Sequence, residues 1–383
     1  MTQLKMKQSQ FLTELQTKGL RLQSADQAHV SRRGGAGPSD HQAITVDGTT
    51  LMVPIYTQTA WSSPFTLSDS DELQQTETGQ QSATLLSDKI PLADVTFAKD
   101  PNFYNLTTAD GIPYSHIATL HSTDVLATTV LQTCIRYESR RKACQFCSIG
   151  QSLRAGRTIA HKTPEQLAEV AKAAVELDGI KHIVMTTGTP AGADRGAKVM
   201  CESAQGIKAV VDVPIQGQCE PPKDPIWYQR MKDAGIDALG MHLEVITPEL
   251  RKSITPGKAE VSLDEYYQAF EDAVAVFGRG QVSTYILAGL GDTQETIVDT
   301  CRKLIEIGVY PFVVPFVPIS GTPLEDRPAP TSEFMEAVLR PLAKELVNLD
   351  MTSDKVKAGC ARCGACSSLS RFEKEAEDER QIA

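Results

Sequence analysis

The chain has 383 residues, of which 41% are hydrophobic and 22% charged, proportions of a globular protein and not of a disordered or collagen-like one. Lys and Arg total 38 against 48 Asp and Glu, and the resulting net charge of −10 argues against binding nucleic acid over a broad basic face. There is no apolar run of about 18 residues and no signal-peptide pattern, so we expect a cytoplasmic protein without a membrane span.

Residues 1–120 have a mixed pattern that predicts an N-terminal extension. A short helix is expected at 8–19, followed by two strands at 43–46 and 50–56 that turn at an Asp-Gly pair. The Gly-rich loop at 32–38 lacks the strand before it and the Lys-Ser/Thr ending of a phosphate-binding loop. We therefore interpret it as a flexible loop.

From about residue 121 the pattern alternates between strand and helix. Apolar runs of strand length lie at 127–132, 182–186, 209–213, 238–243, 282–288 and 312–317. Helical patterns lie between them at 164–177, 194–207, 225–234, 263–277 and 293–307. Helix-linked strands run parallel through right-handed crossovers, so the fold class is α/β, with a partial parallel (β/α)6 TIM-type barrel over residues 121–330. Residues 331–383 are predicted to form a C-terminal helix and a cysteine-rich tail.

Six of the nine cysteines fall into two tight groups, which suit metal binding better than disulfides in a reducing compartment. The first triplet is Cys134, Cys144 and Cys147, directly after the first predicted strand. Three thiolates there can hold three irons of a [4Fe–4S] cluster, and the open fourth iron can take the amino and carboxylate groups of S-adenosylmethionine. The alternative is a zinc site, for which the segment offers His161 well downstream as a fourth ligand.

The C-terminal triplet is Cys360, Cys363 and Cys366, spaced C-x2-C-x2-C among glycines that permit tight wrapping around a metal. Three interpretations are open: a second iron–sulfur cluster, a structural zinc site, and an unligated tail. If it is a cluster, its fourth iron is either open to substrate or electrons, or bound by a distant cysteine such as Cys219. Cys201 and Cys301 have the pattern of buried helix residues.

The first strand, the first triplet and five further strand–helix units resemble the radical S-adenosylmethionine (SAM) superfamily, whose commonest spacing is C-x3-C-x2-C. The spacing here, C-x9-C-x2-C, resembles that of the elongator catalytic subunit, which modifies tRNA. The run DGIPYSHIATLHSTDVLATTVLQTC with ACQFCSIG resembles a bacterial radical SAM family encoded beside a nitrilase.

This resemblance implies a radical SAM enzyme with a [4Fe–4S] cluster and SAM as cofactors. Such an enzyme cleaves SAM reductively to a 5′-deoxyadenosyl radical that acts on a small-molecule substrate, with an electron donor such as a flavodoxin or ferredoxin. Two alternatives stay open, a tRNA-modifying radical SAM enzyme and a non-catalytic iron–sulfur electron carrier. The acidic charge argues against the first, and polar residues at successive strand ends argue against the second.

The strand ends carry the residues that the resemblance assigns to the cofactor, since chemistry in parallel barrels sits at the carboxyl ends of the strands. The superfamily has a Gly-Gly-Glu-like motif after its second strand, where this chain keeps one glycine and no acid. Pro318 opens a segment resembling the adenine pocket of biotin-synthase-like members. The expected cofactor-binding residues are Thr186, Thr187, Gly188, Gln216, Gln218, Glu220, Glu244, Arg251, Gly289, Gly291 and Pro318.

Three residues are candidates for a catalytic role. Strand alternation places His242 and Glu244 on the same side, and a His and a Glu inside a barrel are unfavourable as pure core. Cys219 is the third candidate because it lies in a strand-end segment. For Arg251 the alternative is a surface helix arginine.

Overall fold

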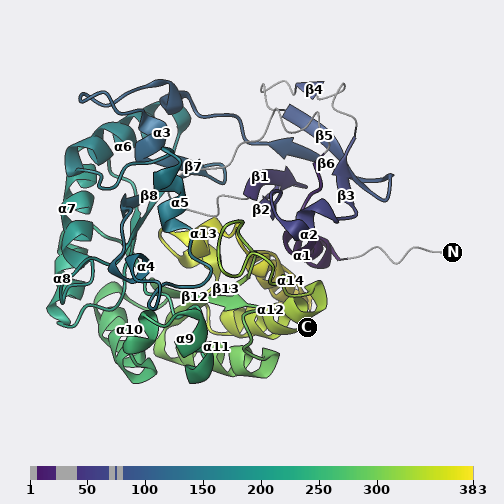
Figure 1. The fold of residues 1–383 in the computed structure, drawn as a ribbon. Helices are drawn as coiled ribbons and strands as arrows, with labels where there is room; N and C mark the ends of the chain where they lie inside the picture. The colour runs from purple at the N-terminus through teal and green to yellow at the C-terminus, as the bar shows by residue number, and fades with distance from the viewer. Residues whose placement is uncertain (1–6, 23–40, 69–73, 76–80, 383) are drawn as a thin grey trace.

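Two β-sheets organise the protein. The computed structural model describes residues 7–22, 41–68, 74–75 and 81–382. Figure 1 shows the smaller N-terminal sheet beside a larger curled sheet, with helices along the outer side of the larger one. The Gly-rich loop predicted at 32–38 lies outside the described residues.

The N-terminal sheet is antiparallel, with strand order β2-β1-β6-β5-β3 and β4 paired to β5. Apolar residues from its strands and from α1, among them Ile44, Leu51 and Leu15, bury together as a separate small core. The predicted helix at 8–19 and both predicted strands are confirmed in this unit. Its elements are α1 (Gln8–Lys18), β1 (His41–Val46), β2 (Thr49–Pro54), α2 (Gln58–Trp61), β3 (Phe65–Leu67), β4 (Gln74–Gln75), β5 (Gln81–Ser87) and β6 (Ile90–Phe97).

The larger sheet has the order β13-β12-β11-β10-β9-β8-β7. Strands β8 to β13 pair in parallel, and β7 pairs antiparallel to β8, so the sheet has seven strands where six were predicted. Strands β7 and β13 are its two edges, which makes it an open, curled sheet. The bounds are β7 (Thr119–His121), β8 (Val125–Leu131), β9 (His182–Thr187), β10 (Ile215–Gln218), β11 (Ala238–Gly240), β12 (Val282–Ala288) and β13 (Val309–Pro315).

One predicted strand, at 209–213, is wrong. Helix α7 continues to Lys208, the following residues turn with Val210 44% exposed, and β10 begins only at Ile215. The apolar run therefore ends a helix and starts a loop. The strand itself is half polar, with Gln216 and Gln218 both buried.

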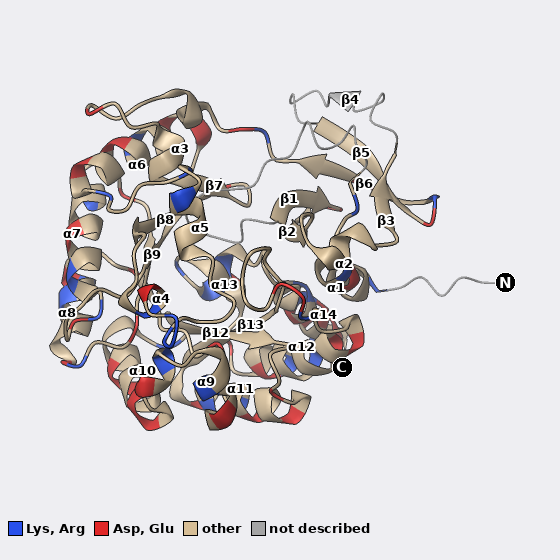
Figure 2. Ribbon diagram, in the orientation of Figure 1, with Lys and Arg blue, Asp and Glu red and all other residues tan. Residues whose placement is uncertain are grey.

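Helices cover the outer side of the curled sheet, and their ends follow local capping chemistry. Thr163 and Gln166 form a reciprocal capping box at the start of α6, and Gly179 ends that helix in a left-handed conformation. Figure 2 shows both signs of charge interspersed along these outer helices. The helices are η3 (Asn102–Asn105), α3 (Tyr114–Ile117), α4 (Ile135–Glu138), α5 (Ile149–Arg154), α6 (Pro164–Asp178), α7 (Ala197–Lys208), α8 (Ile226–Asp233), α9 (Pro248–Ile254), η4 (Lys258–Glu260), α10 (Leu263–Phe277) and α11 (Gln294–Ile307).

The C-terminal residues return to the barrel and do not remain in solvent. Helix α12 packs on α11, α14 and α1, which ties the barrel to the N-terminal unit. The predicted charged tail forms α14, whose Phe372 and Glu373 are buried. These elements are α12 (Ser332–Asn348), η5 (Ser353–Lys355), α13 (Cys360–Cys363) and α14 (Leu369–Ile382). Among the described residues, none of the helices is both long and apolar enough to cross a bilayer.

A buried carboxyl group joins α14 to the barrel. Glu373 accepts hydrogen bonds from the Tyr310 hydroxyl at 2.6 Å and from the Ser353 backbone and hydroxyl at 3.0 and 2.6 Å. Burial nevertheless raises the pKa of Glu373 from 4.5 to about 7. The folded protein therefore keeps this proton to higher pH than the unfolded chain does.

We expect this group to lower the free energy of unfolding by about 1.4 kcal/mol per pH unit as the pH rises from about 4.5 to 7. In Glu373→Gln that part of the pH dependence should disappear, because the side chain no longer ionises. Urea denaturation between about pH 5 and 8 measures it, with Asp378→Asn on the exposed side of α14 as control. Equal pH slopes for wild type and Glu373→Gln would contradict the expectation.

Candidate functional site

A cavity of about 390 Å³ lies inside the curled sheet. Alternate residues of the strands line it, such as Thr129 on β8, Thr186 on β9 and Leu287 on β12, as the strand period of two requires. Cys147 of the first triplet and Cys360 and Cys366 of the C-terminal triplet line the same cavity. The two cysteine groups, far apart in sequence, therefore face one common space.

The first triplet is carried by the loop that follows β8. Cys134 precedes α4, and the next residue, Ile135, donates its N–H to the Thr189 carbonyl at 3.0 Å. Gly188 donates to the Leu131 carbonyl at 2.8 Å, and a Cβ at Gly188 would lie 2.1 Å from the Thr133 carbonyl oxygen. Because backbone meets backbone here, glycine is required for the end of β9 to pack on the cysteine loop.

A second segment, 254–260, supports the same loop from the other side. Gln145 donates its N–H to the Ile254 carbonyl at 2.9 Å, and Gly257 donates to the Lys142 carbonyl at 3.0 Å. Cys147 itself donates its N–H to the Cys144 carbonyl at 3.1 Å, which closes a tight turn between two of the thiols. These contacts fix the backbone that carries Cys144 and Cys147.

A buried ion pair connects the cysteine loop to the end of β10. Arg136 donates to both carboxylate oxygens of Glu220, at 2.6 and 2.7 Å, and the two side chains are 9% and 4% exposed. Arg136 also donates to the Gly257 carbonyl and to Glu260. Glu220, predicted to bind cofactor, is thus engaged by Arg136 and by the Thr189 hydroxyl at 2.7 Å.

The thiols of the first triplet lie in a shared electrostatic environment. Burial raises the pKa of Cys147 to about 11 and that of Cys144 well above its usual value, and both rise further through Cys134 and through the Glu244 carboxylate. A positive charge placed among the thiols lowers their pKa values, because it stabilises the thiolates. The loop is therefore suited to a cationic metal centre.

His242 and Glu244 follow β11 and line the cavity, on the same side as predicted. Glu244 binds the Lys258 ammonium at 2.9 Å through one carboxylate oxygen, while the other oxygen, Oε2, is buried without a hydrogen-bond partner. His242 Nδ1 accepts the Tyr285 N–H at 3.2 Å, so the ring proton is on Nε2, which is also buried without a partner. Two unsatisfied polar atoms therefore belong to the cavity lining.

Two predicted cofactor-binding glutamines on β10 instead contact the C-terminal triplet. Gln218 donates to the Cys360 sulfur at 3.2 Å and to the Gln216 side-chain oxygen at 2.7 Å. Gln216 accepts the Cys360 N–H at 3.2 Å and donates to Ser283 at 3.0 Å. Their hydrogen-bonding groups are thus used within the protein, and Gln218 lines the cavity while Gln216 lies behind it.

Thr186 and Thr187 line the cavity, whereas several other predicted site residues lie away from it. Arg251 is 3% exposed and donates to four backbone carbonyls, those of Leu243, Val245, Lys258 and Val261, so it is neither a surface residue nor turned to the cavity. Pro318 is not itself a lining residue, but its neighbours Val317 and Ile319 are.

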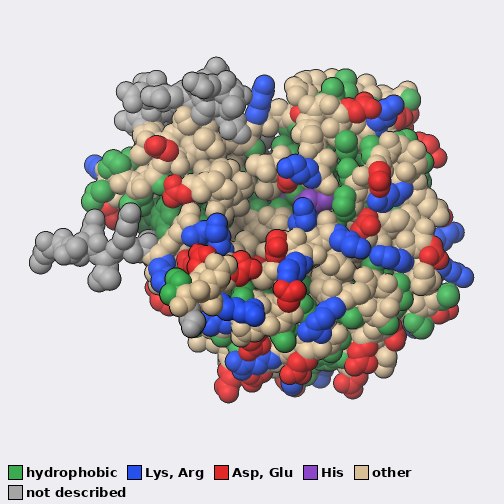
Figure 3. Space-filling view, turned by 180° about the vertical axis from the view of Figure 1, so that it is seen from behind, with side chains coloured by type: hydrophobic (Ala, Val, Ile, Leu, Met, Phe, Trp, Pro, Cys, Tyr) green, Lys and Arg blue, Asp and Glu red, His purple; other side chains and the backbone are tan. Residues whose placement is uncertain are grey.

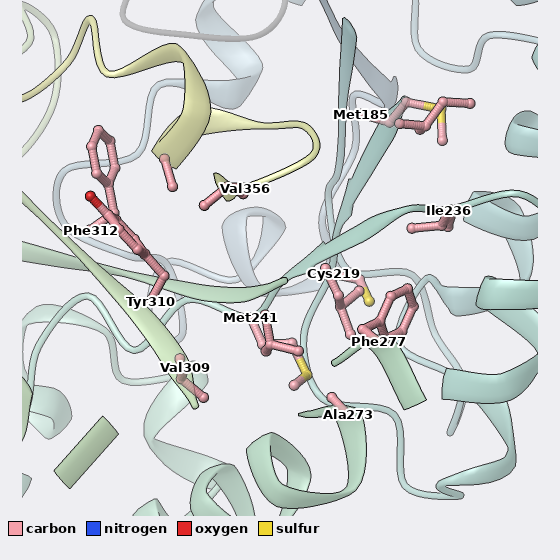
Figure 4. Packing of buried hydrophobic residues seen from close by; sticks show 14 of the residues in the cluster. Met185, Cys219, Ile236, Met241, Ala273, Phe277, Val309, Tyr310, Phe312 and Val356 are labelled. Atoms are coloured by element: carbon pink, nitrogen blue, oxygen red, sulfur yellow. The ribbon is translucent and has the colours of Figure 1, made fainter. Parts of the chain in front are cut away.

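The two predicted glycines of the fifth strand end pack against other loops. Gly289 has φ +103° and Gly291 has φ +122°, and a Cβ would meet Pro330 and Leu250, respectively, at 2.8 and 2.9 Å. Cys219 is also elsewhere, in the core between the sheet and its helices, and Figure 4 shows it among Ile236, Met241 and Phe277. These contacts give the three residues packing roles.

Sequence patterns did not assign three residues that the structure places at the cavity or beside it. His121 on β7 and Tyr285 on β12 line it, and Lys258 holds Glu244. His121 and Tyr285 lie in segments that resemble ordinary core strands, so the sequence pattern did not distinguish them from core residues. Among the described residues, no three His, Cys, Asp or Glu side chains converge closely enough to hold a single metal ion.

Part of the chain matches a known protein family. Residues 140–304 match the model of the radical SAM superfamily, a span that begins after Cys134. The chain is 25% identical over 213 residues to bacteriochlorophyllide c C-7(1)-hydroxylase of Chlorobaculum limnaeum, which covers 51% of this chain and 53% of that protein. It is 32% identical over 94 residues to a probable GTP 3′,8-cyclase of Methanococcus aeolicus, covering 24% and 29% of the two chains. The chain thus spans about half the length of the first relative, and less of the second.

Methylornithine synthase superposes with a TM-score of 0.45 at 18% identity, covering 66% of this chain and 68% of that one. A radical SAM methyltransferase from Sphaerobacter thermophilus superposes with a TM-score of 0.41 at 15% identity, covering 81% and 82%. The family model is the finding that bears most directly on function: residues 140–304 of this chain match the radical SAM superfamily, whose members hold a [4Fe–4S] cluster and cleave SAM reductively.

Proposed function

We propose that this protein is an enzyme that cleaves SAM reductively with a cluster held by the first triplet and acts on a small molecule in the barrel cavity. The observation that carries the proposal is that Cys147, His242 and Glu244 line one cavity, and all three lie in the span that matches the radical SAM superfamily. Parallel barrels carry their chemistry at the carboxyl ends of the strands, where these three residues lie.

The first triplet fits the cluster that the superfamily implies. Its three thiols lie on one loop, burial raises the pKa of Cys144 and Cys147, and two backbone segments fix the loop. A cluster held by three thiolates keeps one iron for a further ligand. Cys134, Cys144 and Cys147 would hold it at the edge of the cavity.

The unpartnered atoms of the cavity fit SAM. An unsatisfied buried polar group costs about 1–3 kcal/mol, so Glu244 Oε2 and His242 Nε2 favour a ligand with matching groups. SAM carries a sulfonium and an ammonium, which suit a carboxylate, and ribose hydroxyls, which accept from an imidazole N–H. When bound with the cluster it supplies the 5′-deoxyadenosyl radical that removes hydrogen from a substrate.

The residues of this chain orient the ligand and exclude water. Lys258 fixes the Glu244 carboxylate through an ion pair. The backbone of Glu244 has φ +62°, a left-handed conformation that is unusual for a residue other than glycine. Burial, together with the nearby Lys258 ammonium, lowers the pKa of His242 to about 3, so its imidazole stays neutral and donates from Nε2. Apolar side chains such as Val184, Leu287 and Phe316 form much of the wall, which keeps water from the reacting groups.

The size of the cavity supports a small-molecule substrate. Cavities of about 300–1,000 Å³ are typical of small-ligand sites, and this one has about 390 Å³. On the face of the molecule drawn in Figure 3, Lys and Arg side chains are interspersed with Asp and Glu. Both features favour a small molecule over tRNA, and an electron carrier would have no use for the cavity.

The proposal includes a second metal centre at the C-terminal triplet and a protein that donates electrons. Cys360 and Cys366 face the cavity, and Cys360 already accepts a hydrogen bond from Gln218, as metal-bound thiolates commonly do. A flavodoxin or ferredoxin is the class of donor that reductive cleavage of SAM requires.

The test is anaerobic reconstitution with iron and sulfide, followed by dithionite, SAM and measurement of 5′-deoxyadenosine. We expect 5′-deoxyadenosine from wild type and from Cys201→Ala, a matched change of a cysteine on α7 outside both triplets. Iron-loaded wild type that forms none of this product would contradict the proposed function.

A further inference from the structure

His121, at the end of edge strand β7 of the curled sheet, lies against the C-terminal triplet. The Cys366 sulfur is 3.7 Å from Nε2 of His121, a side chain 6% exposed at the end of β7. Both residues line the cavity. We propose that His121 is the fourth protein ligand of an iron–sulfur cluster at the C-terminal triplet, which rests on the second metal centre proposed above.

The fold holds this segment across the opening of the curled sheet. Ser367 donates its hydroxyl to the Val313 carbonyl of edge strand β13 at 2.6 Å, while Cys366 meets His121 on the other edge strand, β7. The Ala365 carbonyl accepts the Met52 N–H at 2.8 Å and the Gln16 side chain at 2.9 Å. Both sheet edges and the N-terminal unit thus fix the segment that carries the cysteines.

The start of the segment is fixed as firmly. Gly359 has φ +104° and donates its N–H to Nδ1 of His182 at 3.2 Å, and Gly364 ends α13 with φ +67°. Glycines with positive φ at both ends of a four-residue helix turn the chain sharply before Cys360 and after Cys363. A preorganised loop of this kind suits ligand binding, because little further ordering is needed.

Hydrogen-bond donors surround the sulfurs. Gln218 donates to Cys360 at 3.2 Å, and its contact and that of the Tyr285 hydroxyl favour the Cys360 thiolate, although burial still raises the pKa of Cys360. Burial raises the pKa of Cys363 to about 12, against which the Ser122 side chain acts. Donors aimed at sulfur are the usual environment of metal-bound thiolates.

The packing of Cys219 and the spacing of the ligand side chains bear on the interpretations of the C-terminal triplet. Cys219, the distant cysteine considered from the sequence, packs in the core with Met241 and Phe277, so it does not reach the triplet. Three cysteines and one histidine are also a ligand set that zinc uses. Within the described chain, however, no three ligand side chains converge on one point, which favours a cluster, where each thiolate binds its own iron. With His121 bound, the C-terminal cluster has no open iron for substrate.

The experiment isolates this centre in the full-length chain by replacing Cys134, Cys144 and Cys147 with Ala. After anaerobic reconstitution with iron and sulfide, we expect one cluster per chain. Protein labelled with ¹⁵N-histidine and reduced should then show, by pulsed electron paramagnetic resonance, the strong nitrogen coupling of a directly bound imidazole. In His121→Gln, which keeps an N–H donor, that coupling should be lost.

Two further variants separate ligation from packing. His121→Cys should keep the cluster and lose the nitrogen coupling, because a thiolate replaces the imidazole. His41→Gln changes another buried histidine of the same cavity and should keep the coupling. Strong coupling that persists in His121→Gln would overturn the assignment of His121, as would a cluster without such coupling in the parent.

Failure of the inference can be distinguished from failure of the proposed function. A parent that binds no iron and sulfide, or that binds zinc instead, would overturn both the second centre and its histidine ligand. It would leave SAM cleavage by the first triplet untouched, since 5′-deoxyadenosine formation by wild type tests that separately.

Discussion

Replacing Cys134 by Ala should abolish formation of 5′-deoxyadenosine, by more than about 100-fold, and remove one cluster's share of iron. Cys134 is the proposed ligand of the first triplet that the family match leaves out, since the match begins at residue 140. The structure carries it at the start of the same loop as Cys144 and Cys147, and its negative charge raises the pKa of both. Two remaining thiolates cannot retain a cluster that needs three.

The control is Cys301→Ala, which changes a buried cysteine of α11 remote from both triplets. It should retain iron and product formation at the wild-type level, even if its stability falls through the small cavity it leaves. A Cys134→Ala variant with unchanged iron and full activity would show that another group completes the first cluster. Far-UV circular dichroism checks that both variants are folded.

Replacing Arg136 by Met should lower the free energy of unfolding by about 3–5 kcal/mol, because Glu220 is left charged and buried. Their two hydrogen bonds, at 2.6 and 2.7 Å, join the cysteine loop to the end of β10. The remaining donor to Glu220, the Thr189 hydroxyl, cannot compensate a full charge. Urea denaturation measures the loss, and iron retention measures its effect on the loop.

Two variants make this expectation specific. Arg136→Met/Glu220→Leu should recover most of the lost stability, since replacing both partners removes the unpaired charge. Lys142→Met breaks an ion pair with Glu260 whose side chains are about half exposed, and it should cost less than about 1 kcal/mol. An Arg136→Met variant as stable as Lys142→Met would contradict a structural role for the buried pair.

Much of the barrel follows from local patterns. Helix α10 and strand β12 have the predicted bounds. Ser262 caps the helix, and β12 is apolar apart from Ser283 and Thr284. The strand predicted at 209–213 is wrong because three valines after α7 have high strand propensity but no sheet neighbour, while β10 carries buried glutamines. Polar residues that face a lumen break the apolar pattern on which strand prediction depends.

The candidate site likewise has a part that local sequence patterns predicted and a part that they did not. Cysteine spacing indicated both triplets, and alternation placed His242 and Glu244 together on the cavity side. Gln218 was assigned to a cofactor because its partner, Cys360, is 142 residues away in the chain. No local pattern could indicate that the C-terminal segment enters the barrel, and for the same reason Glu220 and Arg251 gave no sign of their internal partners.

The closing of the curled sheet by residues 365–367 has a consequence for biosynthesis. The contact between Cys366 and His121 spans 245 residues, so this wall of the lumen forms only after every barrel strand has left the ribosome. Contacts of such long range are slow to form. Until this contact forms, the side of the barrel between β7 and β13 is not covered by residues 365–367. For the clusters proposed above, we expect iron and sulfide to enter through that side before residues 365–367 pack against both sheet edges.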